Sequence, residues 1–325
     1  MHGDDKPDLA ERGGVRRPLV AAFGAVCTAC LMLSLGVGWN AAAAEPPENQ
    51  PAGDSVGLMY WTDRSQGIYR AVCDGSEVTL VVEMKETDGL AVDAKHGKLY
   101  FTTSSSGKLF RANLDGTEIT ELVAGLTHTG DVVLDPKSEK LYISSLAGHK
   151  ILQCNLDGTG MKDFVRGLIT PDELAIDLEK RFLYWSHSGR GGPVQRARLD
   201  NGLELTDVVA TRARRFGIVV DTVEQQIYWA DVDPGNIVRS GLDGQGQTTI
   251  VTGRVGLDGL ALDTDNRKIY WTETGKICRA NLDGSGIAVL VSDKTQQWAT
   301  LVILPPKEQE RRKGGSKGPT SVPPS

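Results

Sequence analysis

Short segments of alternating apolar and polar residues fill the chain between about residues 58 and 304. The clearest is MYWTD at residues 59–63, which returns as LYFTT, LYISS, LYWSH, IYWAD and IYWTE, starting at residues 99, 141, 183, 227 and 269. The central tyrosines are 40, 42, 42, 44 and 42 residues apart. Six copies at this period predict one supersecondary unit per copy, with the units stacked around a ring.

Each unit contains four strand patterns separated by turns. In the second unit these are residues 89–93, the tyrosine segment 99–103, residues 109–114 and residues 119–123. An Asp-Gly pair separates the third and fourth strands in five units and predicts a tight hairpin, because glycine accepts a positive φ. The fourth unit has Asp200-Asn201-Gly202 instead, one residue longer, for which we expect a bulged turn. Four antiparallel strands per unit are typical of a propeller blade.

The count of first strands predicts how the ring closes. The N-terminal unit begins directly at its second strand, near Leu58, and an apolar segment, Ala299 to Leu304, follows the sixth unit. We expect this segment to supply the missing innermost strand of blade one, which removes two open sheet edges. The predicted fold over residues 55–304 is therefore an all-β, six-bladed propeller with four antiparallel strands per blade.

Both ends of the chain lie outside the predicted fold. Residues 1–44 contain Arg16-Arg17, an uncharged apolar run at 18–38 and Ala42-Ala43-Ala44, the order of a secretory signal peptide for Sec or twin-arginine export. An uncleaved membrane anchor is the alternative, because the apolar run is just long enough to span a bilayer. We interpret residues 45–54 as a linker and residues 305–325 as a disordered basic tail.

Charge narrows the classes of partner. The chain carries a net charge of −6 although its C-terminal tail is basic, so the propeller itself is more acidic than the total. An acidic body repels phosphate backbones and argues against a nucleic-acid partner, whereas it favours cationic partners. Cys73, Cys154 and Cys278 fall at apolar positions of the repeat, and we interpret them as core thiols.

These motifs resemble the low-density-lipoprotein receptor class B repeat, the YWTD propeller. The resemblance covers residues 58–304 and includes the Gly-Leu-Ala-Val-Asp and Asn-Leu-Asp-Gly signatures, although the second and third copies lack the Trp and terminal Asp. It implies the fold, and a stand-alone exported propeller of bacterial type. Receptor endocytosis and lipoprotein binding are not carried over, because the cysteine-rich modules that flank the animal propellers have no counterpart here. Fold alone does not define function.

The repeated side chains are expected to be structural. A tyrosine in every blade suits inter-blade packing, with its hydroxyl bonded to a buried partner. Third strands carry a recurring arginine, or Gln153 in blade three, which we expect to be partly buried and paired with carboxylates.

Candidate binding residues are those that break the repeat at the face where first strands start and second strands end, called the top face here. Non-repeating residues predicted there are His128, Asp131, His149, Asp172, Glu173, His187, Arg190, Arg215, Phe216 and Trp298. The histidines are either a pH-sensitive binding cluster or solvated loop residues.

First strands open on Asp88, Asp172 and Asp258 in blades two, four and six, which predicts an axial ring of alternating carboxylates. Like charges so placed repel unless a hydrated cation, or a Lys or Arg from a partner, lies between them. Direct calcium chelation is disfavoured by the spacing of opposing blades. The alternative is that the three aspartates only form turns.

Two functions remain open at this point. The first is an exported module that binds a protein or peptide with cationic groups, without a cofactor; the membrane would be involved only if the N-terminal segment is uncleaved. The second is an extracytoplasmic propeller enzyme of the gluconolactonase, paraoxonase or streptogramin-lyase kind, with calcium as its cofactor or His128, His149 and His187 beside Asp172 and Glu173 as a base and orienting carboxylate. No nucleophile motif is present, and we favour the binding module.

Overall fold

The computed structural model describes residues 57–189, 192–210, 214–293 and 298–306. The chain divides into two compact units, Met1–Gln50 and Pro51–Ser325, and the described residues belong to the second. The predicted signal peptide, the linker and all but the first two residues of the predicted tail lie outside the described residues. Among the residues described, no helix is long and apolar enough to cross a bilayer.

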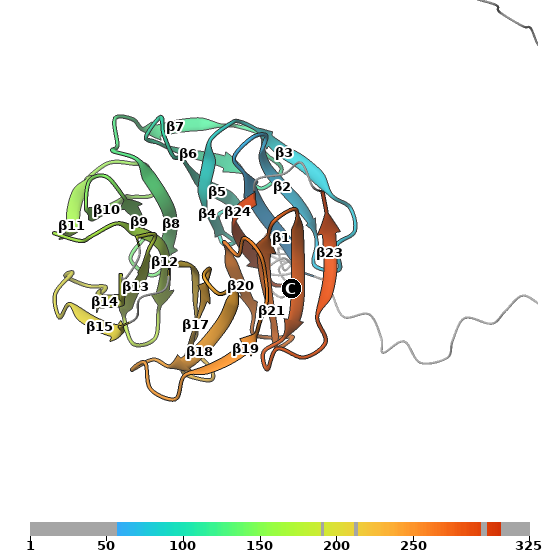
Figure 1. Ribbon diagram of the computed structural model, residues 1–325. Coiled ribbons are helices and arrows are strands. Elements are labelled where there is room, and N and C mark those ends of the chain that lie inside the picture. Colours follow the sequence, from blue (N-terminus) through green and yellow to red (C-terminus); the bar gives the residue numbers. More distant parts are fainter. Residues whose placement is uncertain (1–56, 190–191, 211–213, 294–297, 307–325) are drawn as a thin grey trace, which may run out of the picture. The chain divides into compact units, whose positions relative to one another are not determined.

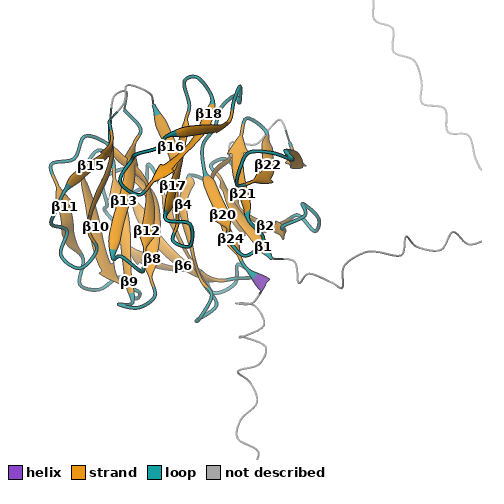
Figure 2. Cartoon of the chain, turned by 90° about the horizontal axis from the view of Figure 1, so that it is seen from below, coloured by secondary structure: helices purple, strands orange, loops and turns teal. Residues whose placement is uncertain are grey.

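Six four-stranded antiparallel sheets are arranged around a common axis, which confirms the predicted propeller (Figure 1). From the innermost strand outwards, blades one to three are β24 (Trp298–Leu304), β1 (Leu58–Asp63), β2 (Gly67–Val72), β3 (Thr79–Glu83); β4 (Thr87–Asp93), β5 (Lys98–Thr103), β6 (Lys108–Asn113), β7 (Thr120–Val123); and β8 (Thr129–Asp135), β9 (Lys140–Ser145), β10 (Lys150–Asn155), β11 (Lys162–Arg166). Blades four to six are β12 (Pro171–Asp177), β13 (Phe182–His187), β14 (Val194–Arg198), β15 (Thr206–Val209); β16 (Arg215–Asp221), β17 (Gln226–Asp231), β18 (Asn236–Gly241), β19 (Thr248–Val251); and β20 (Leu260–Asp263), β21 (Lys268–Glu273), β22 (Lys276–Asn281), β23 (Ala288–Ser292). Seen at 90° to the first view, the loops gather at two opposite faces of the ring (Figure 2).

The hydrophobic core lies between blades. One cluster joins Ala91 and Tyr100 of blade two to Val132, Leu141 and Ile143 of blade three, and equivalent clusters follow around the ring. All six signature tyrosines are buried, as predicted. The three described cysteines are also buried and free, which confirms their interpretation as core thiols.

The recurring arginines bind differently from the prediction. Strand register places each signature tyrosine directly opposite the third-strand Arg, or Gln153 in blade three. Arg196 donates to the carbonyl of Leu242 at 3.0 Å and Arg279 to that of Cys73 at 3.3 Å, each in the following blade. For Arg196 and Arg279, the predicted carboxylate partners are thus replaced by tyrosine and main-chain oxygens, because the planar guanidinium reaches across the blade interface.

Asp-Gly turns also join the blades. Gly116 has φ +83°, and a Cβ there would lie 1.7 Å from the carbonyl oxygen of Val81 in the preceding blade. Glycine is required at this position both for the turn and for the close approach. In blade four the longer predicted turn is present, with the Gly202 amide donating to the Arg198 carbonyl at 2.8 Å.

Strand β24 closes the ring as expected. It pairs antiparallel with β1, with Leu304 opposite Leu58 and Val302 opposite Tyr60, and a bulge lies near the top end. Blade one is therefore built from both ends of the propeller sequence.

We predict that this closure is required for folding. Truncation after Lys294 removes β24 and exposes the edge of β1, so the product should aggregate or be cleaved rapidly by protease. Truncation after Pro306 leaves all four strands of blade one and should melt like the full chain. A Lys294 truncation that melts cooperatively at the full-length temperature would be incompatible with this closure.

A pair of Gly→Ala variants separates turn strain from inter-blade contact. Gly125 has φ +76° and no atom near its Cβ position, so Gly125→Ala should lower the free energy of unfolding by about 1–2 kcal/mol. Gly116→Ala carries the same strain and also meets the backbone of blade one, which adds roughly 1–3 kcal/mol. Equal losses in urea titrations would show that the close approach contributes nothing.

Candidate functional site

The top ends of the innermost strands are shaped by β-bulges. The register shifts between Thr87 and Leu90, between Thr129 and Val132, and between Pro171 and Leu174. Two consecutive residues of each innermost strand are therefore displayed around the axis where regular pairing would display one. The upper ring consists of Asp88, Gly130, Asp172, Phe216, Asp258 and Ala299, and the lower ring of Gly89, Asp131, Glu173, Gly217, Gly259 and Thr300.

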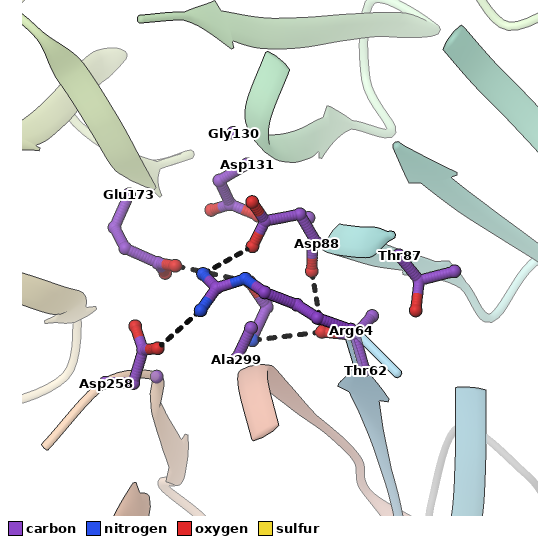
Figure 3. Close-up of polar contacts among 12 residues, drawn as sticks. Thr62, Arg64, Thr87, Asp88, Gly130, Asp131, Glu173, Asp258 and Ala299 are labelled. Carbon is purple, nitrogen blue, oxygen red and sulfur yellow. Dashed lines mark hydrogen bonds and ion pairs between the residues drawn. The ribbon is translucent and has the colours of Figure 1, made fainter. Parts of the chain in front are cut away.

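Signature threonines hold these bulges. The Thr62 hydroxyl donates to the carbonyl of Asp88 at 2.7 Å in the next blade and accepts from the Thr300 amide at 3.1 Å in its own. Thr272 makes the same pair of bonds, to the carbonyl of Ala299 at 3.0 Å and from the amide of Gly259 at 2.9 Å. The threonine of the repeat thus positions both rings (Figure 3).

Arg64 lies at the top mouth and contacts two carboxylates of the upper ring. Its Nη2 is 2.8 Å from Asp88 Oδ1 and its Nη1 is 3.4 Å from Asp258 Oδ2 (Figure 3). Two of the three predicted axial carboxylates, Asp88 and Asp258, therefore share a positive group that the chain itself supplies. Sequence analysis missed Arg64, although a signal existed: the equivalent positions, which follow the tyrosine segment, are Ser104, Leu146, Ser188, Val232 and Thr274.

Burial dominates the electrostatics of the upper ring. It raises the pKa of Asp258 to about 6 even though Arg64 lowers it. It also raises the pKa of Asp172 well above its usual value, with further increases from Asp88 and Asp258. Burial alone would lower the pKa of Arg64. The negative charges of Asp88 and Asp258 have the larger combined effect, so the pKa of the guanidinium is raised.

The lower ring holds two more carboxyls. Asp131, 4% exposed, accepts from the amides of Val132 at 2.8 Å and Leu174 at 3.1 Å, yet burial raises its pKa to about 7. Glu173, 7% exposed, accepts from the Thr300 hydroxyl at 3.2 Å. Because Thr300 belongs to blade one and Glu173 to blade four, this bond spans the ring. Burial, followed by the charge of Asp131, raises the pKa of Glu173 well above its usual value.

Two predicted top-face residues belong to the core, which corrects their placement in exposed loops. His187 ends β13 and is fully buried, with Nε2 2.9 Å from Gln195 Oε1 and Nδ1 accepting from the Thr170 amide at 3.2 Å. Burial lowers its pKa. Arg215 is also fully buried, 2.9 Å from Asp231.

Three further predicted residues, His128, His149 and Phe216, are more exposed than His187 and Arg215. His128 and His149 are exposed turn residues with φ +43° and +53°. Phe216 is half-buried in the upper ring, and the Arg214 guanidinium lies 5.1 Å from its ring centre. Arg190 and the side chain of Trp298 lie outside the described residues.

The residues present do not fit a calcium ion at the mouth. Calcium takes six to eight oxygen ligands, whereas the space between Asp88 and Asp258 holds the Arg64 guanidinium, whose charge would repel a metal ion. Within the described ranges, no group of three or more His, Cys, Asp or Glu side chains is placed to hold a metal.

Fold and site together define a six-bladed propeller with an acidic axial mouth. No protein-family model matches the sequence, and no curated protein matches it. Among solved structures, the chain is similar to one from the crystal structure of a nidogen/laminin complex, with 17% identity, a TM-score of 0.70, and coverage of 76% of this chain and 98% of that one. It is also similar to a putative TolB from Agrobacterium tumefaciens, with 13% identity, a TM-score of 0.58, and coverage of 72% and 88%. The resemblance to a YWTD propeller is thereby confirmed at the level of fold.

Replacing Glu173 should change how stability depends on pH. Its folded pKa is raised from 4.5, so the folded protein binds more protons than the unfolded chain above that pH, and the free energy of unfolding falls as pH rises. Glu173→Gln keeps the acceptor for Thr300 and removes this effect. As pH rises above about 4.5, the variant should gain stability relative to the wild type in urea titrations.

Asp157→Asn is a control of opposite sign. Hydrogen bonds from Thr159 lower the pKa of Asp157 below 3.8, so this variant should lose relative stability as pH rises toward that value. If the difference in the free energy of unfolding between Glu173→Gln and the wild type did not change with pH, the lower ring would not contain an uncompensated carboxyl.

Proposed function

We propose that this chain is an exported protein that binds a protein or peptide through the top face, with a Lys or Arg of the partner meeting the acidic mouth. One observation carries the proposal. Five carboxyls, those of Asp88, Asp131, Asp172, Glu173 and Asp258, converge on the mouth, and Arg64 forms ion pairs with two of them. A concentration of one charge at a low-dielectric opening attracts the opposite charge.

Asp172 is the proposed docking point. Arg64 stands in blade one between Asp88 and Asp258, so Asp172 is the upper-ring carboxylate on the opposite side of the mouth. It is half-buried and makes no ion pair with any described residue. A partially desolvated carboxylate gains more from an arriving cation than a fully hydrated one does.

The neighbours of Asp172 suit a protein surface. Phe216 follows it in the upper ring and carries the Arg214 guanidinium against its ring. An aromatic side chain beside a charged group is typical of residues that dominate binding energy. A similar propeller chain comes from a complex of nidogen and laminin, which supports a protein partner here. Export rests on the signal peptide predicted at residues 1–44.

The enzyme alternative has one favourable observation. Asp131 has a pKa of about 7, suited to general acid–base chemistry, and lies in the lower ring. However, both of its oxygens already accept main-chain amides. Turnover in a lactone-hydrolysis screen, lost in Asp131→Asn, would favour this function over binding alone.

The binding proposal is tested with a hexalysine probe. Asp172→Asn keeps the size of the side chain but removes its charge, and should weaken hexalysine binding about tenfold in fluorescence anisotropy. Asp243→Asn, at an exposed turn on the other face, carries the same change in net charge and should leave the affinity unaltered. Equal affinities for both variants would mean that the probe responds only to net charge.

Acidification provides an internal check on the same proposal. Asp258 has a pKa of about 6, so it takes up a proton as pH falls through that value and the mouth becomes less negative. Hexalysine affinity should therefore decrease from pH 7 to pH 5. A His128→Gln/His149→Gln variant should show the same decrease if the carboxyls cause it, and a smaller one if the exposed histidines do.

A further inference from the structure

Below the lower ring, the axis of the propeller is a cavity of about 240 Å³ to which all six innermost strands contribute. Its walls are apolar and include Val133, Ile176, Val220, Leu262 and Ile303. The polar side chains in its lining are those of Asp131, Glu173 and Thr300, at its top end. The cavity is therefore a hydrocarbon-lined channel that ends at two carboxyls and a hydroxyl.

The channel continues toward the bottom face, and the Arg64 guanidinium lies above its upper end. A second cavity of about 350 Å³ shares Leu90, Val133, Ile176 and Val302 with the first. Its remaining lining includes Ala94, Pro136 and Leu178, from the turns below the innermost strands. At the other end Arg64 bridges Asp88 and Asp258 across the mouth. A small molecule would enter from below.

One carboxylate oxygen of Glu173 lacks a hydrogen-bond donor among the described residues. One of its oxygens accepts from Thr300, whereas the other has no hydrogen-bond partner among the described residues. No described cation forms an ion pair with it, and its nearest charged neighbours are carboxyls. A buried carboxylate is costly unless it is paired and hydrogen-bonded. Its open oxygen, at the end of a cavity, indicates a missing donor.

We propose that the axial channel binds a small aliphatic primary amine as its ammonium ion. The ammonium lies among Glu173, Asp131 and Thr300, and the alkyl chain points down the channel toward the bottom face. An ammonium has three donors and no acceptor, and these side chains offer a free carboxylate oxygen, remaining carboxylate lone pairs and a hydroxyl oxygen. The apolar walls match the methylene groups, which gain free energy when they leave water.

Other cations fit this position less well. A metal ion needs more oxygen ligands than the lower ring supplies, and no described group of side chains is placed to hold one. The upper ring already binds a planar guanidinium, that of Arg64, through Asp88 and Asp258. The inference is independent of the proposed top-face partner, because it concerns a different end of the same carboxyl cluster.

Isothermal titration of the full chain with hexylammonium tests the proposal. Affinity should rise roughly fourfold for each methylene from methylammonium to hexylammonium, because each added CH₂ is buried in the channel. Hexanol, which has the same chain without the charge, should bind at least about tenfold more weakly. Binding should also release protons at pH 7, because a bound ammonium favours the ionised form of Glu173.

Matched variants locate the site. Glu173→Gln should weaken hexylammonium binding at least about tenfold and reduce proton release to the part that Asp131 supplies, and Thr300→Val, of similar shape, should weaken binding several-fold. Asp172→Asn, one residue away in the upper ring, should leave hexylammonium affinity within about threefold while it weakens hexalysine binding. This crossed pattern distinguishes failure of the channel site from failure of the top-face site.

Three outcomes would overturn the inference. They are absence of saturable hexylammonium binding, equal affinity for hexanol and hexylammonium, and unchanged affinity in a Glu173→Gln protein that melts cooperatively. Affinity that is independent of alkyl-chain length would show that a bare cation is bound at the carboxyls and that the channel is not used.

Discussion

The structure depends on the fact that a blade cannot bury its apolar faces alone. Each four-stranded sheet packs against its neighbours, and the tyrosines, arginines and Asp-Gly turns of the repeat all make contacts across these interfaces. Such an array is stable only when it closes, because an open ring would expose one apolar face on each terminal blade and two open sheet edges. Closure by β24 is therefore a condition for every other feature described.

Closure also assembles the site. Arg64 follows β1 and Thr300 lies in β24, so the cation of the upper ring and the hydroxyl of the lower ring come from opposite ends of the propeller sequence. The Thr62 hydroxyl links the two chain ends and the next blade, through the Thr300 amide and the Asp88 carbonyl. The same contacts that complete blade one thus set the distances among the axial carboxyls. The residues of the repeat that have no direct chemical role still determine where the non-repeating residues lie.

Sequence periodicity was sufficient to predict the blade count, the strand order and the closing strand, because those features depend on repeated local patterns. The axial carboxylates Asp88, Asp172 and Asp258 could also be predicted, since their position follows from strand order. The arrangement of side chains within the site could not. The bulges that create a second ring depend on long-range bonds from Thr62 and Thr272, and the burial of His187 and Arg215 depends on partners such as Gln195 and Asp231. Arg64 was overlooked because it follows the repeat by one residue.

The carboxyl cluster opposes the stability that the rest of the fold provides. Burial raises the pKa of Asp131, Asp172 and Glu173, so holding them ionised at neutral pH lowers the free energy of unfolding. Apolar residues at these positions would remove that penalty, and the residues two positions further along the innermost strands, Val133, Leu174 and Ala175, are apolar. Arg64 relieves the repulsion at only one side of the upper ring, and no cation of the described residues contacts the lower ring. Because Arg64 pairs only with carboxylates of the upper ring, the positive charge that the lower ring lacks would have to come from a ligand, and the apolar cavity beneath the lower ring is the reason to look for that ligand there.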